Sequence, residues 1–127
     1  MSDPLYQEYI LELYRQPHNK TVPAEFDVRH KERNPLCSDE VEIFVKFDSA
    51  GRVTDIGFQG EGCAISQAGI SLITDHAKGK PKEELKQMTT DDMLRLLGLP
   101  NISPARLGCA TLGLKALQKS INNPTQK

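Results

Sequence analysis

A glycine-rich stretch between a predicted strand and a predicted helix constrains this chain most. Residues 57–66 have the sequence GFQGEGCAIS, which follows an alternating, half-polar segment and leads into apolar residues at helical spacing over 64–78. Gly60 and Gly62 are expected to turn the backbone with positive φ. Cys63 is therefore predicted at a strand-to-helix corner, close to the first helical turn. Unpaired N–H groups and the positive end of the helix dipole favour a thiolate there, so this sulfur is suited to bind a metal or to attack another sulfur.

Length and composition predict a single domain spanning residues 1–127. The chain has 127 residues, 38% hydrophobic and 26% charged, which is ordinary for a globular domain. Its net charge of −1 and the lack of Lys/Arg runs longer than two argue against nucleic-acid binding. No apolar run has the length of a membrane span, and the acidic start, MSDP, does not resemble a signal peptide. Three cysteines do not suit a disulfide framework, so we expect a cytoplasmic protein with free thiols or a metal.

The order of predicted elements is a helix, about three strands and then further helices. The first helix is capped by Ser2 or Asp3 and ends at Pro17. A short edge strand is predicted near Phe26 and Val28, and strands over 41–47 and 52–59 form a hairpin around the turn at 48–51. The remaining predicted helices cover 64–78, 81–88, the segment after a Thr89–Asp92 capping box, and the segment from Ser103–Pro104 to about Ile121. This pattern predicts an α+β fold in which a small three-stranded antiparallel sheet packs against about five helices.

The first predicted helix carries an apolar stripe that includes three tyrosines. Leu5, Tyr6, Tyr9, Ile10, Leu13 and Tyr14 are spaced to lie on one side of it. Such a stripe could bind a partner, but surface helices usually bury it against their own domain. We therefore expect this helix to pack on the sheet.

Three cysteines and one aspartate are the candidate chemical residues. Cys37, Cys63 and Cys109 each lie at the edge of a predicted element, and Asp39 follows Cys37 in an extended turn. Three thiolates and a carboxylate suit zinc or an iron–sulfur cluster. No pair has CxxC spacing, so spacing alone favours a metal site and three ordinary buried cysteines equally.

The three histidines and a hydrolytic activity receive little weight. His18 and His30 occur in polar segments and His76 lies late in a helix, so each is expected to be a surface or hydrogen-bonded residue rather than a ligand. A Cys–His hydrolase has no local nucleophile signature in this sequence.

Four segments in the same order resemble the IscU/SufU family, the scaffold proteins of iron–sulfur cluster assembly that are related to the N-terminal domain of NifU. YRQPHN at 14–19 resembles YxNPRN, and NPLCSD at 34–39 resembles NPxCGD. FQGEGCAIS at 58–66 resembles FxGxGCAIS, and PARLGCATL at 104–112 resembles PARxxCATL. The resemblance covers nearly the whole chain, and four ordered motifs strongly favour the metal site over three core cysteines.

The resemblance implies a SufE/NifU-like fold that gathers Cys37, Asp39, Cys63 and Cys109 at one exposed end of the sheet. These four residues would hold a [2Fe–2S] cluster, or zinc as the alternative occupant. The implied protein is a scaffold rather than an enzyme, although a sulfurtransferase-type relay stays open. Its partners would be a cysteine desulfurase, which docks on the N-terminal helix near Tyr6, and acceptor apo-proteins or downstream cluster carriers.

This chain departs from the family motifs at several positions. Ser38 replaces the glycine of the CGD motif, and Gly108 replaces the histidine that precedes the third cysteine in the IscU branch. ISPAR at 102–106 is closer to the SufU branch than to LPPVK, whereas the short connection between the second and third cysteines is IscU-like. Three functions therefore remain: a cluster scaffold, a zinc-bound sulfur relay and a structural zinc domain. A monomer and a cluster-linked dimer are both open.

Two expectations about sulfur chemistry complete the hypothesis. Cys109 is the predicted first sulfur acceptor, because a helix terminus and the neighbouring Arg106 favour its thiolate. Asp39 is a harder and weaker partner for iron than a thiolate, and this should keep the cluster labile.

Overall fold

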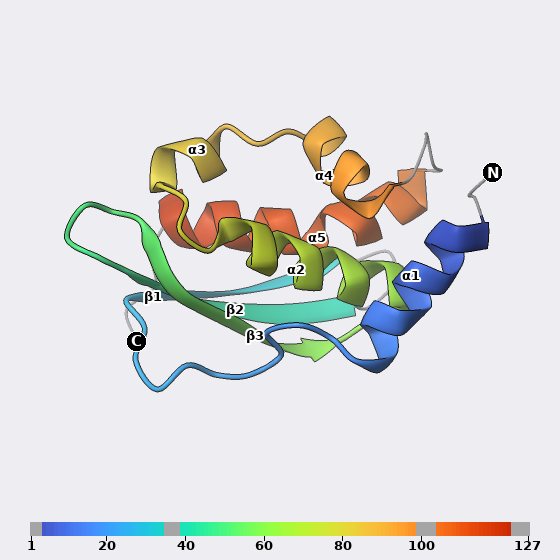
Figure 1. Cartoon of the computed structure of the whole chain (residues 1–127), viewed down its shortest axis with the longest axis horizontal. Coiled ribbons are helices and arrows are strands. Elements are labelled where there is room, and N and C mark those ends of the chain that lie inside the picture. The colour runs from blue at the N-terminus through green and yellow to red at the C-terminus, as the bar shows by residue number, and fades with distance from the viewer. Residues whose placement is uncertain (1–3, 35–38, 99–103, 123–127) are drawn as a thin grey trace.

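The computed structural model describes residues 4–34, 39–98 and 104–122, and for residues 4–7 and 104–105 it describes the backbone alone. A three-stranded antiparallel sheet and five helices form the described chain, as predicted (Figure 1). The elements in order are α1 (Pro4–Arg15), β1 (Val28–Asn34), β2 (Asp39–Phe47), β3 (Val53–Glu61), α2 (Ala64–Ala77), α3 (Lys82–Lys86), α4 (Thr90–Leu97) and α5 (Pro104–Asn122).

The sheet has the strand order β1–β2–β3, so the short strand after Phe26 lies at an edge as expected. Alternation along β2 turns Val41, Ile43 and Val45 into the core, where they are almost fully buried. The register pairs Asn34 with Asp39, at the end of the sheet where β1 ends and β2 begins. Side chains at this end and on the core-facing side can therefore meet the ends of the covering helices.

The helices cover one face of the sheet in two layers (Figure 1). α5 packs on β1 and β2, and α2 packs on β3 and alongside α5. α3 and α4 lie over these two helices on the side away from the sheet. The core between the layers contains Phe58, Ile70, Ile73, Leu112 and Leu117.

The expectation that α1 packs on the sheet is wrong. α1 packs against α2 instead, at the end of the molecule where α2 begins (Figure 1). Ile10 and Leu13 are buried there, whereas Tyr9 and Tyr14 keep 43% and 48% of their surface exposed. The two buried residues, one helical turn apart, hold α1 on a single neighbouring helix. The two tyrosines are not needed for this contact and remain on the surface.

The glycine-rich corner differs in detail from the prediction. β3 continues through Gly60, which has a φ of 125° and lies so close to β2 that an added Cβ would be 2.2 Å from the Glu40 carbonyl oxygen. Gly62 does not have a positive φ. It is required for space instead, because a Cβ there would lie 2.3 Å from Ser66 Oγ. The strand can thus run directly into α2 without a left-handed residue after Gly60.

The connection between α1 and β1 is tied to the rest of the fold by polar contacts. Asn19 donates to Thr74 Oγ1 and Asp75 Oδ1 at 2.9 and 2.8 Å, and His18 Nδ1 lies 2.5 Å from Asp75 Oδ2. Partial burial favours the protonated form of Asp75, but the hydrogen bonds with His18 and Asn19 outweigh it and lower the pKa.

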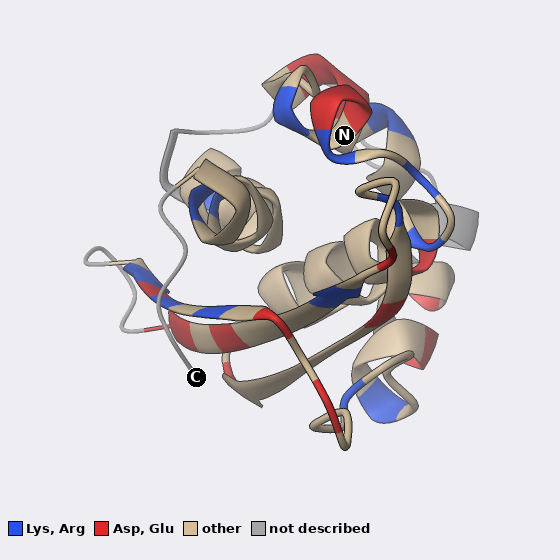
Figure 2. Ribbon diagram, turned by 90° about the vertical axis from the view of Figure 1, so that its left-hand side faces the viewer, with Lys and Arg blue, Asp and Glu red and all other residues tan. Residues whose placement is uncertain are grey.

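Several further predictions can be checked against the described helices. The Thr89–Asp92 capping box is present at the start of α4, and α5 begins at Pro104 as predicted. No helix among the described residues is long and apolar enough to cross a membrane. Figure 2 shows Lys and Arg intermixed with Asp and Glu on the helices and along the strands.

Candidate metal and sulfur site

Three of the four predicted site residues meet at the end of the sheet. Asp39 is the first residue of β2, Cys63 immediately precedes α2, and Cys109 lies in α5. One potential ligand atom from each, two sulfurs and a carboxylate oxygen, lie within 4.8 Å of one another. Residues far apart in the sequence are brought together because α5 packs on both β2 and α2, and Cys63 lies between β3 and α2 at this end.

Cys63 is the N-cap residue of α2, at the corner predicted from the sequence. Its backbone is extended, with φ −72° and ψ 170°, and its side chain makes no capping hydrogen bond. Ser66 Oγ donates instead to the Cys63 carbonyl oxygen at 3.0 Å. The thiol is therefore not used to cap the helix, and it is exposed to solvent.

The other two side chains are buried, so among the described site residues the expected exposure is found for Cys63 alone. Asp39 is 6% exposed and Cys109 is 7% exposed. The carboxylate lies against Gly62, where an added Cβ would be 3.1 Å from Asp39 Cγ. A reagent from solvent therefore meets Cys63 before it meets Asp39 or Cys109.

Cys109 lies beyond the first turn of α5, which begins at Pro104. Because the effect of the helix dipole falls off within the first turn, the helix terminus contributes less to this sulfur than the sequence suggested. Arg106, the other expected source of positive charge, is exposed. Side chains from neighbouring elements also pack around the Cys109 sulfur.

One of those side chains, Asn34, was not singled out from the sequence. Its amide Nδ2 donates to Cys109 Sγ at 3.5 Å, and Asn34 is 6% exposed. The signal was present in the periodicity of β1, because Asn34 is in phase with the buried Val28 and therefore on the core side of the strand. In the sequence, Asn34 stands out only as the first residue of the NPLCSD segment.

Two predicted site residues have side chains outside the described part of the chain. Cys37 lies outside the described residues, as does the Ser38 substitution beside it. The side chain of Tyr6, the predicted docking residue, is also outside the described part. Their roles as a ligand and as a desulfurase contact stay predictions.

The three histidines do not belong to the cluster formed by Asp39, Cys63 and Cys109. His30 Nε2 lies 2.8 Å from Glu32 Oε1, and Lys119 Nζ lies 2.9 Å from Glu32 Oε2. Partial burial favours protonation of Glu32, but these two partners outweigh it and lower its pKa. The contact joins β1 to α5, so it helps to hold the helix that carries Cys109.

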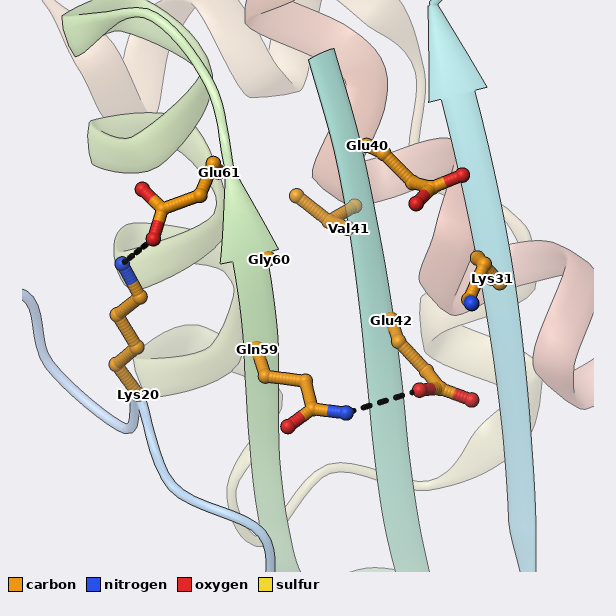
Figure 3. A pocket seen from close by; sticks show the side chains of 8 residues that line it. All are labelled: Lys20, Lys31, Glu40, Val41, Glu42, Gln59, Gly60 and Glu61. Atoms are coloured by element: carbon orange, nitrogen blue, oxygen red, sulfur yellow. Dashed lines mark hydrogen bonds and ion pairs between the residues drawn. The ribbon is translucent and has the colours of Figure 1, made fainter.

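A shallow pocket lies on the other face of the same strands (Figure 3). Glu40, Glu42 and Glu61 line it together with Lys20 and Lys31. Glu42 accepts a hydrogen bond from Gln59 at 3.1 Å, and Lys20 lies 3.8 Å from Glu61. The carboxylates are thus partly neutralised by nearby cations and amides, and the described residues that line the pocket include no cysteine. We therefore place the candidate site on the helical side of the sheet.

The donor set fits a zinc or iron ion. Thiolate and carboxylate are established ligands of both metals. In a tetrahedral zinc site with Zn–S bonds of about 2.3 Å, sulfur ligands lie about 3.8 Å apart. The observed separations of up to 4.8 Å require only a small contraction for the three atoms to reach one ion.

Comparison with known proteins gives a consistent match along the chain. The family model described as the NifU-like N terminal domain matches residues 5–127. The zinc-dependent sulfurtransferase SufU of Bacillus subtilis is 36% identical over 135 residues, covering 94% of this chain and 90% of the relative. The iron-sulfur cluster assembly scaffold protein IscU 1 of Archaeoglobus fulgidus is 31% identical over 117 residues, covering 92% of this chain and 74% of the relative.

Among solved structures, the chain resembles that of a protein from Fervidobacterium islandicum, described as a scaffold for the SUF system. The TM-score is 0.75 with 24% sequence identity, and the match covers 90% of this chain and 94% of the other. At this identity the likeness supports the fold alone.

The alignment with the Bacillus relative is longer than this chain, so that relative carries residues that are absent here.

Proposed function

Because this chain belongs to the family of NifU-like N-terminal domains, we propose that it is an iron–sulfur cluster assembly scaffold. In this proposal it receives persulfide sulfur from a cysteine desulfurase together with iron, and an electron donor supplies the two electrons that reduce each sulfur to sulfide. The chain builds a labile [2Fe–2S] cluster and passes the cluster to acceptor proteins. The observation that carries the proposal is the grouping of Asp39, Cys63 and Cys109 within 4.8 Å. Cys37 is the fourth proposed ligand, from the segment between β1 and β2.

The site combines one exposed and two buried side chains, and this combination suits a cluster that must enter and leave. Cys63 is exposed, so a sulfur donor or an acceptor protein can approach it directly. Asp39 and Cys109 are buried, so the bound sulfur is shielded from bulk water on the inner side. A carboxylate binds iron more weakly than a thiolate does. The bond between Asp39 and iron should therefore break first when the cluster is released.

The sulfur transfer that we propose requires no external oxidant. The Cys109 thiolate attacks the terminal sulfur of a persulfide on the desulfurase cysteine, forming a new S–S bond. The S–S bond of the donor breaks at the same time and its cysteine leaves as a thiolate. Cys109 then carries the transferred sulfur as a persulfide. Because Cys109 is only 7% exposed, the donor persulfide has to enter beside Cys63.

A second candidate function is a zinc-bound sulfur relay, in which zinc is resident and sulfur alone is passed on. The similarity to a zinc-dependent sulfurtransferase in Bacillus subtilis favours it. So does Gly108, which provides no side-chain ligand at the position before Cys109. Bound zinc would hold the thiols as thiolates, and one cysteine would have to leave the metal before attacking a persulfide.

The deciding experiment is purification of the protein without oxygen, followed by its ultraviolet–visible spectrum and metal analysis. A cluster scaffold gives a brown protein with visible absorbance, and iron and sulfide in equal amounts after reconstitution. A zinc relay gives a colourless protein with one zinc per chain that still accepts sulfur. Zinc without any sulfur acceptance contradicts both functions and supports a structural zinc domain.

The identity of the sulfur acceptor is tested separately by mass spectrometry. After incubation with a cysteine desulfurase and cysteine, peptides from the wild-type chain should carry a persulfide on Cys109. A Cys109→Ser variant should accumulate none at that position while retaining its fold. Persulfide confined to Cys37 or Cys63 contradicts the assignment of Cys109.

A further inference from the structure

The Cys109 sulfur receives a hydrogen bond from a side chain on a different element. Asn34, the last residue of β1, donates from its amide Nδ2 to Cys109 Sγ at 3.5 Å. Both residues are buried, with 6% and 7% exposure. Because little water can reach this contact, the amide and the sulfur interact more strongly than they would at the surface.

Gly108 provides the space for this amide. A Cβ added at residue 108 would lie 3.1 Å from Asn34 Nδ2, which is tighter than nine in ten real Cβ contacts. A side chain at residue 108 would therefore require the Asn34 amide to move by a few tenths of an ångström. The Asn34 amide can occupy its position beside the Cys109 sulfur because residue 108 has no side chain.

An N–H donor changes what a thiolate sulfur can do. A hydrogen bond to a charged group is stronger than one between neutral groups, and it withdraws electron density from the sulfur. The sulfur then donates less charge to a bound metal, and it becomes a better leaving group because less negative charge builds up on it. A leaving thiolate at Cys109 is formed whenever a persulfide there gives up its outer sulfur.

We propose that Asn34 is a positioning residue for sulfur release, whose amide holds the Cys109 sulfur and stabilises it as the leaving thiolate. The inference rests on the proposed function, in which Cys109 carries the persulfide. In the release step an acceptor thiolate attacks the outer sulfur and forms a new S–S bond. The bond between the outer sulfur and Cys109 Sγ breaks, and its electron pair stays on Sγ. The Asn34 amide faces the atom that gains this charge.

The first test uses Co²⁺ as a spectroscopic probe of the sulfurs. Wild-type protein, Asn34→Leu and Asn34→Ala are loaded with Co²⁺ alone, and the sulfur-to-cobalt charge-transfer band is recorded. Loss of the hydrogen bond makes the sulfur a better electron donor, so both variants should show this band at longer wavelength. Asn34→Ala only removes atoms from the site. It therefore provides the same comparison if the larger leucine side chain does not fit at residue 34.

The matched control is Thr111→Val. Thr111 is also buried on α5 and its hydroxyl donates to the Leu107 carbonyl oxygen at 2.8 Å, so the variant removes one polar contact near the site without taking a donor from the sulfur. Its Co²⁺ spectrum should match that of the wild type. A shift in Thr111→Val equal to that in the Asn34 variants would mean that general loosening of α5 causes the change, and this would overturn the proposal.

The second test measures release. Protein carrying persulfide on Cys109 is mixed with excess dithiothreitol, and the disappearance of the persulfide is followed by mass spectrometry. Removal of a hydrogen bond to a charged group should slow release by about tenfold in the Asn34 variants and leave Thr111→Val unchanged. Wild-type rates and an unshifted Co²⁺ band in the Asn34 variants would overturn the inference alone. A wild-type chain that neither binds Co²⁺ nor accepts sulfur would contradict the proposed function and the inference with it.

Discussion

Asp39 is the residue at which the competing functions make opposite predictions. Its carboxylate is buried between β2 and the glycine corner, within 4.8 Å of two cysteine sulfurs. Among thiolate ligands, an oxygen ligand forms the weakest bond to iron. The strength of this bond therefore determines how readily a cluster dissociates. In a zinc site the same carboxylate is one of only a few ligands. Its loss therefore weakens zinc binding, and nothing offsets that loss of affinity.

Replacement of Asp39 by alanine should therefore separate the two functions. In a cluster scaffold, Asp39→Ala should keep its [2Fe–2S] chromophore longer in air and transfer the cluster more slowly, because the pocket around the thiolates becomes drier. In a zinc relay it should weaken zinc binding by roughly tenfold or more, given that even outer contacts contribute 10–100-fold. The measurement is the decay of the visible absorbance after anaerobic reconstitution, or a zinc titration.

The control for this change is Glu40→Ala. Glu40 is the next residue on β2, but it is exposed and lines the pocket on the opposite face. It should leave both cluster decay and zinc affinity unchanged. Faster decay of the chromophore in Asp39→Ala than in Glu40→Ala would contradict the argument that the carboxylate makes the cluster labile.

At the scale of the elements, the contact between β1 and α5 is expected to depend on pH. Glu32 is ionised when it binds His30 and Lys119, and its pKa is lowered in the folded state. A group with a lowered pKa stabilises the fold above its unfolded pKa, and this contribution is lost as the pH falls through the folded value.

Glu32→Gln should accordingly lower the free energy of unfolding at neutral pH by about 0.5–1 kcal/mol, a range suited to a partly exposed ion pair. The difference from wild type should shrink as the pH falls from about 5 to about 3. Urea titrations at several pH values measure it, with the exposed Glu40→Gln as control. A difference that stays constant across this range would show that ionisation of Glu32 does not contribute.

The exposed face of α1 is the element that we expect to contact the desulfurase. Tyr9 and Tyr14 are nearly half exposed, whereas Ile10 and Leu13 hold the helix on the fold. The double variant Tyr9→Ser, Tyr14→Ser should weaken binding to a cysteine desulfurase by about tenfold or more, since exposed tyrosines are frequent anchors of interfaces. Metal content and melting temperature should stay the same.

Binding to the desulfurase is measured by titration calorimetry. Glu12→Ala, on an exposed position of the same helix, is the matched control and should bind like the wild type. Unchanged affinity in the double tyrosine variant would mean that α1 serves only to cover α2.

At the scale of the whole molecule, metal binding should stabilise the fold. The proposed ligands among the described residues come from β2, the N-cap of α2 and α5, which are adjacent only when the chain is folded. A metal that binds the folded state alone, at a hundred times its dissociation constant, contributes about 2.7 kcal/mol. For a domain of this size the melting temperature should rise by about 10 °C.

Thermal unfolding with zinc and with a chelator provides the measurement. Cys63→Ala should abolish most of the rise while changing the metal-free melting temperature little, because this side chain is exposed. Equal melting temperatures with and without zinc in the wild type would contradict a metal site built from these three elements.

The sequence by itself determined the elements and three of the residues that meet at the candidate site. Strand alternation in 41–47, the capping box at Thr89 and the glycine corner before Cys63 were all predicted, because each depends on residues within a few positions of one another. Motif resemblance selected Cys37, Asp39, Cys63 and Cys109. The fold brings the last three within 4.8 Å, and Cys37 lies outside the described residues.

Only the tertiary structure decided how those residues are surrounded. Burial of Asp39 and Cys109, the hydrogen bond from Asn34, and the packing of α1 on α2 each depend on how β1, α2 and α5 meet. Gly62 likewise proved necessary for its small volume beside Ser66 rather than for its backbone angle. Contacts between elements arise from the packing of the whole core, and no local periodicity in the chain encodes them.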